Sequence, residues 1–456
     1  MTSKARNILI VAGIAIAATL GIIGYAAYSL YSFFDGMADF RKVPDELKDP
    51  RVLKGEGFLR KSEMFKLTND GILGAISKGM SKSDERERQK VVSAETAKSI
   101  FNFSDLEVVG NEIIAVGKFG AFVFDLDGNL KRQILFEVVK ENVKIGPFET
   151  NTYQSDLDNL RIAKLDNERF GFLSWGSMEG VRVFDDTGKE IWSYDRQNVH
   201  LDNLLKDEKE RNEDYKKSTY VMEVAVGDLD GDGVSEYIVA RKSDGIHAFD
   251  RQGNEKWFQP DDFPNSPIEI ADLDGDEKNE ILQGSKVRDG NGNLLRELKG
   301  GLYDEISSAA LFARNKNGQL SIQSCHIYLS KLVCWDENKE TLLSGEAPLS
   351  EVKEDPKRID IPDHPESSFT SDTQSVAHPK AVWISLDPNK PKYLAIVAAY
   401  IGPPRGNLYV YEPNGNLVFH ELLGEDAETI AVLPGHDGNE ELLVGGKNTI
   451  WKYSLN

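Results

Sequence analysis

From about residue 105 to the end of the chain, short apolar segments alternate with turns in a repeating order. Two apolar strands lead to a third that ends in an aromatic residue and an aspartate, and a glycine turn follows. The clearest copies of this third strand read FVFDLDGN (Phe122–Asn129), VRVFDDTGKEIW (Val181–Trp192) and IHAFDRQGNEKW (Ile246–Trp257). Such alternation, interrupted by glycine turns, is typical of β-strands joined by tight hairpins.

Weaker copies bring the number of repeats to seven. They read KVRDGNGN (Lys286–Asn293), LVCWDENK (Leu332–Lys339), LYVYEPNGN (Leu408–Asn416) and the terminal TIWKYSLN. No single copy can bury both faces of its own sheet, so we expect the copies to stack radially as blades. The pattern therefore predicts an all-β fold, a seven-bladed β-propeller over residues 101–456. A β-helix and a two-domain sandwich are the alternatives.

The last copy ends after its third strand, which leaves its blade one strand short. We expect a segment on the N-terminal side, for example Ser99–Phe103, to supply the fourth strand and close the ring. The aromatic residue before each aspartate is expected to pack between neighbouring blades as part of the core.

An apolar segment without any charged residue runs from Ile8 to Phe34. It is long enough to cross the hydrocarbon core of a bilayer as a helix. Lys4 and Arg6 precede it, and this favours a cytoplasmic N-terminus. The segment predicts a single transmembrane helix that acts as a signal anchor. A signal peptide cleaved near Gly24-Tyr25-Ala26 is the alternative, but the apolar segment is longer than the apolar region of such peptides.

These patterns divide the chain into four parts. Residues 1–7 are expected to form a cytoplasmic N-terminus, 8–34 the transmembrane helix, 35–100 a stalk or linker, and 101–456 the propeller. The propeller would then lie outside the cytoplasm, in the periplasm or at the cell surface, and most simply in a bacterium.

The chain is strongly acidic, with a net charge of -21 from 54 basic and 75 acidic side chains. Such a surface repels nucleic acid and anionic lipid headgroups, so no nucleic-acid partner is expected. It suits divalent cations and basic partners. It also keeps an exported domain in solution, which is the simpler explanation of the charge.

Two repeats carry an acidic loop between their first two strands. In DLDGDGVSE, positions 1, 3, 5 and 9 hold Asp228, Asp230, Asp232 and Glu236, and position 7 offers the carbonyl of Val234. In DLDGDEKNE the same positions hold Asp272, Asp274, Asp276 and Glu280, and position 7 offers the carbonyl of Lys278. Ca²⁺ takes roughly six to eight oxygen ligands, and one tight loop with this spacing can supply most of them. Carboxylates so close together repel one another without a cation, so both loops are predicted Ca²⁺ sites of a structural kind.

The two acidic repeats, VAVGDLDGDGVSEYIVAR and IEIADLDGDEKNEILQG, resemble the FG-GAP/VCBS repeat family, which also occurs in integrin α heads. The resemblance covers these copies and weakens in the others. For example, LPGHDGNEE (Leu433–Glu441) keeps only Asp437 and Glu441 at ligand positions. The resemblance implies a seven-bladed propeller with calcium in the outer hairpins.

A weaker resemblance lies in the turns DDTGKEIW and DRQGNEKW, which are similar to the tryptophan-docking turn of quinoprotein-type propellers. That superfamily includes quinone-dependent dehydrogenases and non-enzymatic scaffolds of outer-membrane assembly. The adjacent cysteine pair expected of the dehydrogenases is absent from this sequence. The resemblance therefore implies the fold and not the chemistry.

The chain has two cysteines, Cys325 and Cys334, at the ends of CHIYLSKLVC. A turn at Leu329-Ser330 would place them directly opposite each other on a hairpin, close enough for a disulfide. A location outside the cytoplasm permits this bond. Two buried free thiols are the alternative.

The sequence contains no familiar catalytic motif: it lacks G-x-S-x-G, a P-loop and H-E-x-x-H. Two long insertions, Gln197–Tyr220 and Gly345–Lys380, interrupt the repeats, and loops of this length often carry function. We interpret the chain as a membrane-anchored scaffold that binds a protein or glycan and is stabilised by Ca²⁺. A calcium-dependent polysaccharide lyase or hydrolase is the alternative, because a fold does not fix a function. A surface adhesion module would differ from the scaffold mainly in the membrane that holds it.

Overall fold

The computed structural model describes the following residues: 50–68, 103–117, 120–136, 138–145, 148–155, 159–165, 169–176, 180–194, 221–241, 245–260, 268–276, 278–298, 308–314, 320–328, 331–348, 358–361, 364–370, 376–400, 406–425, 427–435 and 438–456. The predicted transmembrane segment 8–34 and the insertion 197–220 lie outside them. Within these stretches no helix has the length and apolar character needed to cross a bilayer.

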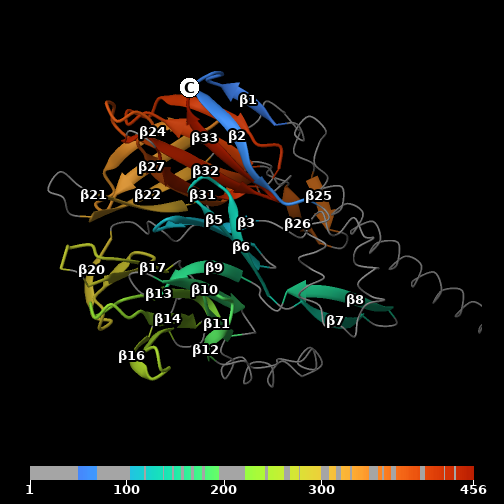
Figure 1. Ribbon diagram of the computed structural model, residues 1–456, viewed down its shortest axis with the longest axis vertical. Helices are drawn as coiled ribbons and strands as arrows, with labels where there is room; N and C mark the ends of the chain where they lie inside the picture. The colour runs from blue at the N-terminus through green and yellow to red at the C-terminus, as the bar shows by residue number, and fades with distance from the viewer. Residues whose placement is uncertain are drawn as a thin grey trace, which may run out of the picture.

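The described chain is an all-β propeller of seven antiparallel blades (Figure 1). Blade 1 holds β3 (Phe103–Val109), β4 (Glu112–Gly117), β5 (Gly120–Asp125) and β6 (Leu130–Leu135); blade 2 holds β9 (Asn159–Lys164), β10 (Phe170–Gly176), β11 (Gly180–Asp185) and β12 (Glu190–Tyr194). Blade 3 holds β13 (Val221–Gly227), β14 (Glu236–Arg241), β15 (Gly245–Phe249) and β16 (Glu255–Pro260); blade 4 holds β17 (Ile268–Ala271), β18 (Glu280–Gln283), β19 (Lys286–Arg288) and β20 (Leu294–Glu297).

The last three blades follow the same plan. Blade 5 holds β21 (Ser308–Arg314), β22 (Leu320–Tyr328), β23 (Lys331–Asp336) and β24 (Thr341–Glu346). Blade 6 holds β27 (Val376–Ile384), β28 (Tyr393–Tyr400), β29 (Gly406–Tyr411) and β30 (Leu417–Leu422); blade 7 holds β31 (Ala427–Pro434), β32 (Glu440–Gly446) and β33 (Thr449–Leu455). The fold predicted from the seven repeats is confirmed, and the alternatives of a β-helix and a sandwich are wrong.

An N-terminal strand closes the ring, but it is not the predicted one. β2 (Leu59–Lys66) pairs antiparallel with β33 and becomes the fourth strand of blade 7. β1 (Arg51–Lys54) pairs with β30 and adds a fifth strand to blade 6. The expected closing segment Ser99–Phe103 is wrong, because Phe103 instead begins β3 in blade 1. Residues 51–66, placed in the stalk on sequence grounds, therefore belong to the propeller.

The glycine turns bind each blade to the one before it. A Cβ atom on Gly253 would lie 2.7 Å from the indole nitrogen of Trp192, and one on Gly292 would lie 2.8 Å from the ring of Trp257. Each tryptophan on an outer strand thus packs against the glycine turn of the next blade. At the closure, Met64 of β2 takes this role against Gly128 of blade 1. Only glycine leaves room for the approach, and its positive φ is also required by the turn.

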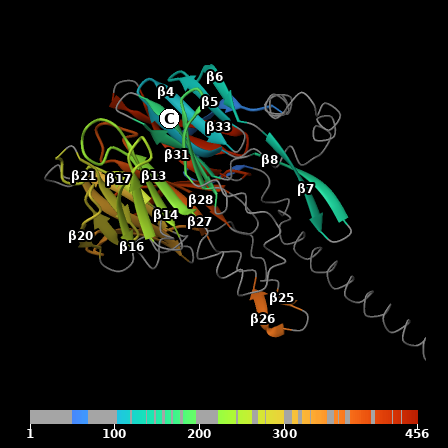
Figure 2. The ribbon, with the colours of Figure 1, turned by 90° about the horizontal axis from the view of Figure 1, so that it is seen from below.

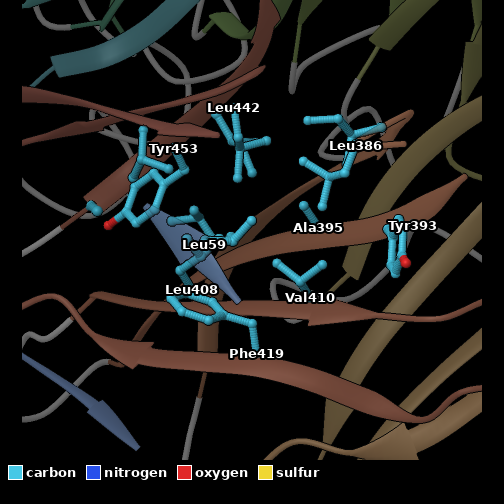
Figure 3. Packing of buried hydrophobic residues seen from close by; sticks show 14 of the residues in the cluster. Leu59, Leu386, Tyr393, Ala395, Leu408, Val410, Phe419, Leu442 and Tyr453 are labelled. Carbon is cyan, nitrogen blue, oxygen red and sulfur yellow. The ribbon is translucent and has the colours of Figure 1, made fainter. Parts of the chain in front are cut away.

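The hydrophobic core lies between the faces of neighbouring blades. Figure 3 shows the cluster between blades 6 and 7, in which Leu59 from β2 lies among Leu408, Phe419, Leu442 and Tyr453. All of these side chains are buried. The closing strand therefore contributes to the core as well as to the hydrogen-bond ladder.

Two hairpins lie outside the blades and project beyond them (Figure 2). The first, β7 (Val138–Ile145) and β8 (Phe148–Ser155), connects blades 1 and 2. The second, β25 (Arg358–Ile361) and β26 (His364–Thr370), lies in the insertion Gly345–Lys380 between blades 5 and 6. Each forms a two-stranded sheet of its own and pairs with no blade.

A disulfide joins Cys325 on β22 to Cys334 on β23, with 4.0 Å between their Cα atoms. The two residues are direct partners in the strand register. Both are buried in the cluster between blades 5 and 6, which also includes Leu343 and Ala347.

Candidate metal sites

The acidic loop of blade 3 connects β13 to β14 and is folded around its own carboxylates. Asp228 accepts hydrogen bonds from the backbone N–H groups of Gly231 and Gly233, both at 2.8 Å. Asp232 accepts one from the N–H of Val234 at 2.7 Å. Gly231 and Gly233 both have positive φ, which allows the sharp bends of the loop.

A lysine ammonium group lies between two of these carboxylates. Lys256 on β16 donates to Asp230 Oδ2 and to Glu236 Oε1, both at 2.7 Å. The other oxygen of Glu236 accepts the N–H of Leu229 at 2.8 Å, and Glu236 is 5% exposed. The hydrogen bond from Lys256 lowers the pKa of Asp230. Partial burial of Lys256 opposes ionisation, but the two carboxylates outweigh it and raise its pKa.

Three hydrogen bonds inside the acidic loop of blade 4 repeat those of the blade 3 loop. Glu280 accepts the N–H of Leu273 at 2.7 Å and is 6% exposed. Asp272 accepts the N–H of Gly275 at 2.6 Å, and Asp276 accepts that of Lys278 at 2.9 Å. Burial raises the pKa of the Glu280 carboxyl, and the neighbouring aspartates raise it further. The repulsion among these carboxylates is what a bound cation would relieve.

The structure brings most, but not all, of the predicted ligands together. Carboxylate oxygens of Asp228, Asp230 and Glu236 lie within 4.8 Å of one another, and so do those of Asp272, Asp274 and Asp276. Asp232 and Glu280 fall outside these two groups. The backbone carbonyls of Val234 and Lys278 remain predicted ligands.

The two loops also connect neighbouring blades. Ser235, at the end of the first loop, donates from its hydroxyl to the carbonyl of Lys164 in blade 2 at 2.7 Å. Asn279, at the end of the second loop, donates from its side-chain amide to the carbonyl of Asp228 in blade 3. A cation bound in either loop would therefore reinforce contacts between blades 2, 3 and 4.

Sequence reasoning missed a cluster of charged groups on the innermost strands, which we call the axial charge cluster: Glu107 on β3, Lys164 on β9, Glu223 on β13, Glu269 on β17 and Lys380 on β27. Burial raises the pKa of Glu107 to about 8; Asp105 and Glu269 reinforce the shift, whereas Lys380 and Lys164 oppose it. Glu107 is nevertheless exposed to solvent, so screening by water limits the size of this shift but not its direction. The sequence signal was a charged residue inside the apolar first strand of several repeats.

Within this cluster Glu223 is held by an ion pair. Arg161 on β9 donates to its Oε1 at 3.0 Å, and Glu223 is 9% exposed. Burial raises the pKa of Glu223, and Arg161 opposes the rise. The Arg161 guanidinium also lies over the ring of Trp175 at 4.9 Å, so the pair ties blade 2 to blade 3.

No protein-family model matches the chain, and no curated protein sequence matches it. Three similar solved structures are BamB from Moraxella catarrhalis, BBS1N in complex with ARL6DN, and the exotype rhamnogalacturonan lyase YesX. BamB is 11% identical with a TM-score of 0.35, and the match covers 78% of this chain and 83% of BamB. BBS1N is 11% identical with a TM-score of 0.39, and the match covers 78% of this chain and 97% of BBS1N. YesX is 15% identical with a TM-score of 0.40, and the match covers 78% of this chain and 72% of YesX.

Proposed function

We propose that this chain is a membrane-anchored propeller outside the cytoplasm, that it acts as a scaffold binding a protein or glycan partner, and that Ca²⁺ stabilises it. The main support is the pair of projecting hairpins, β7–β8 and β25–β26, which pair with no blade. Strands that add nothing to the ring are available to contact another molecule.

The proposed anchor is supported by how close the apolar segment lies to the propeller along the chain. Phe34 ends that segment, and β1 begins at Arg51. The sixteen intervening residues span at most about 55 Å when fully extended. The propeller would thus work close to the membrane surface. The disulfide supports a location outside the cytoplasm, where thiols are not kept reduced.

Crosslinking of the tethered full-length protein in its own cells tests the scaffold role. Replacing β7–β8, residues 138–155, by a short Gly-Ser linker should remove the main crosslinked partner and leave the melting temperature unchanged. A second variant replaces β25–β26, residues 358–370, in the same way and shows which of the two hairpins holds the partner. A partner retained by both variants and by their combination would contradict a role for the hairpins.

Calcium stabilisation is tested separately by adding a chelator and measuring the melting temperature together with bound Ca²⁺. We expect bound Ca²⁺ in the untreated protein and a lower melting temperature after chelation, because carboxylates that lose their bound ion then repel one another. Protein that holds no Ca²⁺ at millimolar concentration would argue against this part of the proposal.

The alternative, an enzyme acting on polysaccharides, is favoured by one observation. Glu107 has a pKa of about 8 and interacts with the carboxylates of Asp105 and Glu269. A carboxyl group that stays protonated near neutral pH beside other carboxylates is the arrangement of a general acid. Activity on a panel of polysaccharides that disappears in Glu107→Gln would support this alternative. The scaffold predicts no turnover in either protein.

A further inference from the structure

The two acidic loops differ in the side chain that their outer strand presents. In blade 3 the turn Asp250–Asn254 leads into β16, where Phe249 pairs with Glu255 and Ala248 with Trp257. In blade 4 the turn Asp289–Asn293 leads into β20, where Arg288 pairs with Leu294 and Val287 with Arg296. Both ladders shift register between these pairs. Lys256 and Leu295 are the residues inside the shift, so they occupy equivalent positions.

The lysine holds a positive charge where a loop of this kind would bind a metal ion. Its ammonium contacts Asp230 and Glu236, which are positions 3 and 9 of the loop. Each carboxylate uses its second oxygen to accept a backbone N–H, from Asp232 and Leu229 respectively. Both carboxylates are therefore satisfied without any further ligand.

The equivalent carboxylates in blade 4 have the same backbone hydrogen bonds but a different neighbour. Asp274 accepts the N–H of Asp276 at 3.2 Å, and Glu280 accepts that of Leu273 at 2.7 Å. Leu295 offers no charge, and 54% of its surface is exposed. Among the residues that the structure describes, no basic side chain forms an ion pair with Asp274, Asp276 or Glu280.

We infer that Lys256 is the built-in counter-ion of the blade 3 loop, and that of these two loops only the one in blade 4 binds Ca²⁺. A metal ion in blade 3 would have to displace the ammonium, break two charge-assisted hydrogen bonds and remain near a positive charge. At Asp274, Asp276 and Glu280 in blade 4, the described residues place no such ammonium group. The claim that the blade 4 loop binds Ca²⁺ rests on the proposed function. The claim that Lys256 is the counter-ion of the blade 3 loop does not.

Bound Ca²⁺ per chain, measured by equilibrium dialysis on the full-length protein, tests the inference. Asp274→Asn should lose one bound Ca²⁺, and Asp230→Asn should lose none. Compared with the wild type, Lys256→Gln should bind one more Ca²⁺ per chain, and Leu295→Lys should bind one fewer. Thermal melting with and without Ca²⁺ checks that each variant folds; Lys256→Gln should show a larger calcium-dependent rise in melting temperature than the wild type.

The outcomes separate the two claims. If the wild type binds no Ca²⁺ but Lys256→Gln binds one, the role of Lys256 is supported and calcium binding by blade 4 is overturned. If Asp230→Asn loses a Ca²⁺ from the wild type, the lysine does not exclude metal and the inference fails. It also fails if Lys256→Gln folds and gains no Ca²⁺.

Discussion

Lys61 on the closing strand donates to Glu421 on β30 at 2.7 Å, and this ion pair crosses the boundary between blades 7 and 6. The same ammonium lies 4.3 Å from the centre of the Trp451 ring on β33. The side chain of Glu421 is 5% exposed and that of Lys61 is 26% exposed. One residue of β2 therefore binds the last two blades together.

Lys61→Ala should lower the free energy of unfolding by about 1–3 kcal/mol, because it leaves the buried Glu421 carboxylate without its partner. Urea denaturation measures the change. The matched control is Lys66→Ala on the same strand, whose pair with Glu63 is 4.0 Å long and exposed; it should cost less than about 1 kcal/mol. Adding Glu421→Gln to Lys61→Ala should recover part of the loss, and equal losses in Lys61→Ala and Lys66→Ala would contradict this account.

Gly253→Ala should be markedly destabilising, since the new Cβ would lie 2.7 Å from the Trp192 indole nitrogen at a φ of +87°. Gly110→Ala is the matched control: its φ is +58°, and nothing lies within 4 Å of the added atom. The control carries only the backbone strain of about 1–2 kcal/mol. Gly253→Ala should cost roughly 1–3 kcal/mol more because of overpacking. If Gly253→Ala and Gly110→Ala lose equal stability in thermal and urea unfolding, the tryptophan contact does not hold the blades together.

The propeller should become less stable as the pH rises toward 8, in part because of Glu107. Its folded-state pKa of about 8 is above the ordinary value of 4.5, so the folded state favours the protonated form. This contribution is complete below about pH 4.5 and is lost as the pH rises through 8. Melting temperatures from pH 5 to 9 measure it. In Glu107→Gln the decline over this range should be smaller, and an unchanged profile would speak against the shift.

Removing the disulfide should destabilise blade 5. Replacing Cys325 and Cys334 by alanine opens a short loop, and the loss is expected to be about 2–3 kcal/mol by chain entropy. Before alkylation, the intact mass without reductant should be lower by two hydrogen atoms than the mass with it. Equal masses would mean that the thiols are free.

The repeats could be found from sequence because each blade combines alternating apolar residues with a turn that needs glycine. Gly128, Gly188, Gly253 and Gly415 all have positive φ, as such turns require. The closing strand could not be found in this way. β2 is an outer strand with most of its residues partly or fully exposed, so LRKSEMFK lacks a regular apolar alternation. Its pairing with β33 depends on contacts nearly four hundred residues apart.

The acidic loops were also visible in the sequence, because their ligands follow one another at fixed spacing. The contact of Lys256 with the first loop was not visible, since Lys256 lies twenty residues after Glu236 and reaches the loop only through the β15–β16 hairpin. The axial charge cluster could not be predicted for the same reason: its members come from different blades and meet only when the ring is closed.

If the proposed anchor holds the propeller at a membrane, the closing strand has a mechanical consequence. Tension between the membrane and a bound partner would enter the domain at residue 50 and pass first to β1 and then to β2. The β1–β30 and β2–β33 ladders would bear the load before any other part of the ring. Peeling β2 away would also withdraw Leu59 from the core and Lys61 from Glu421. Under the proposed tethering, the strand that completes the ring is therefore the first place where tension would open the propeller.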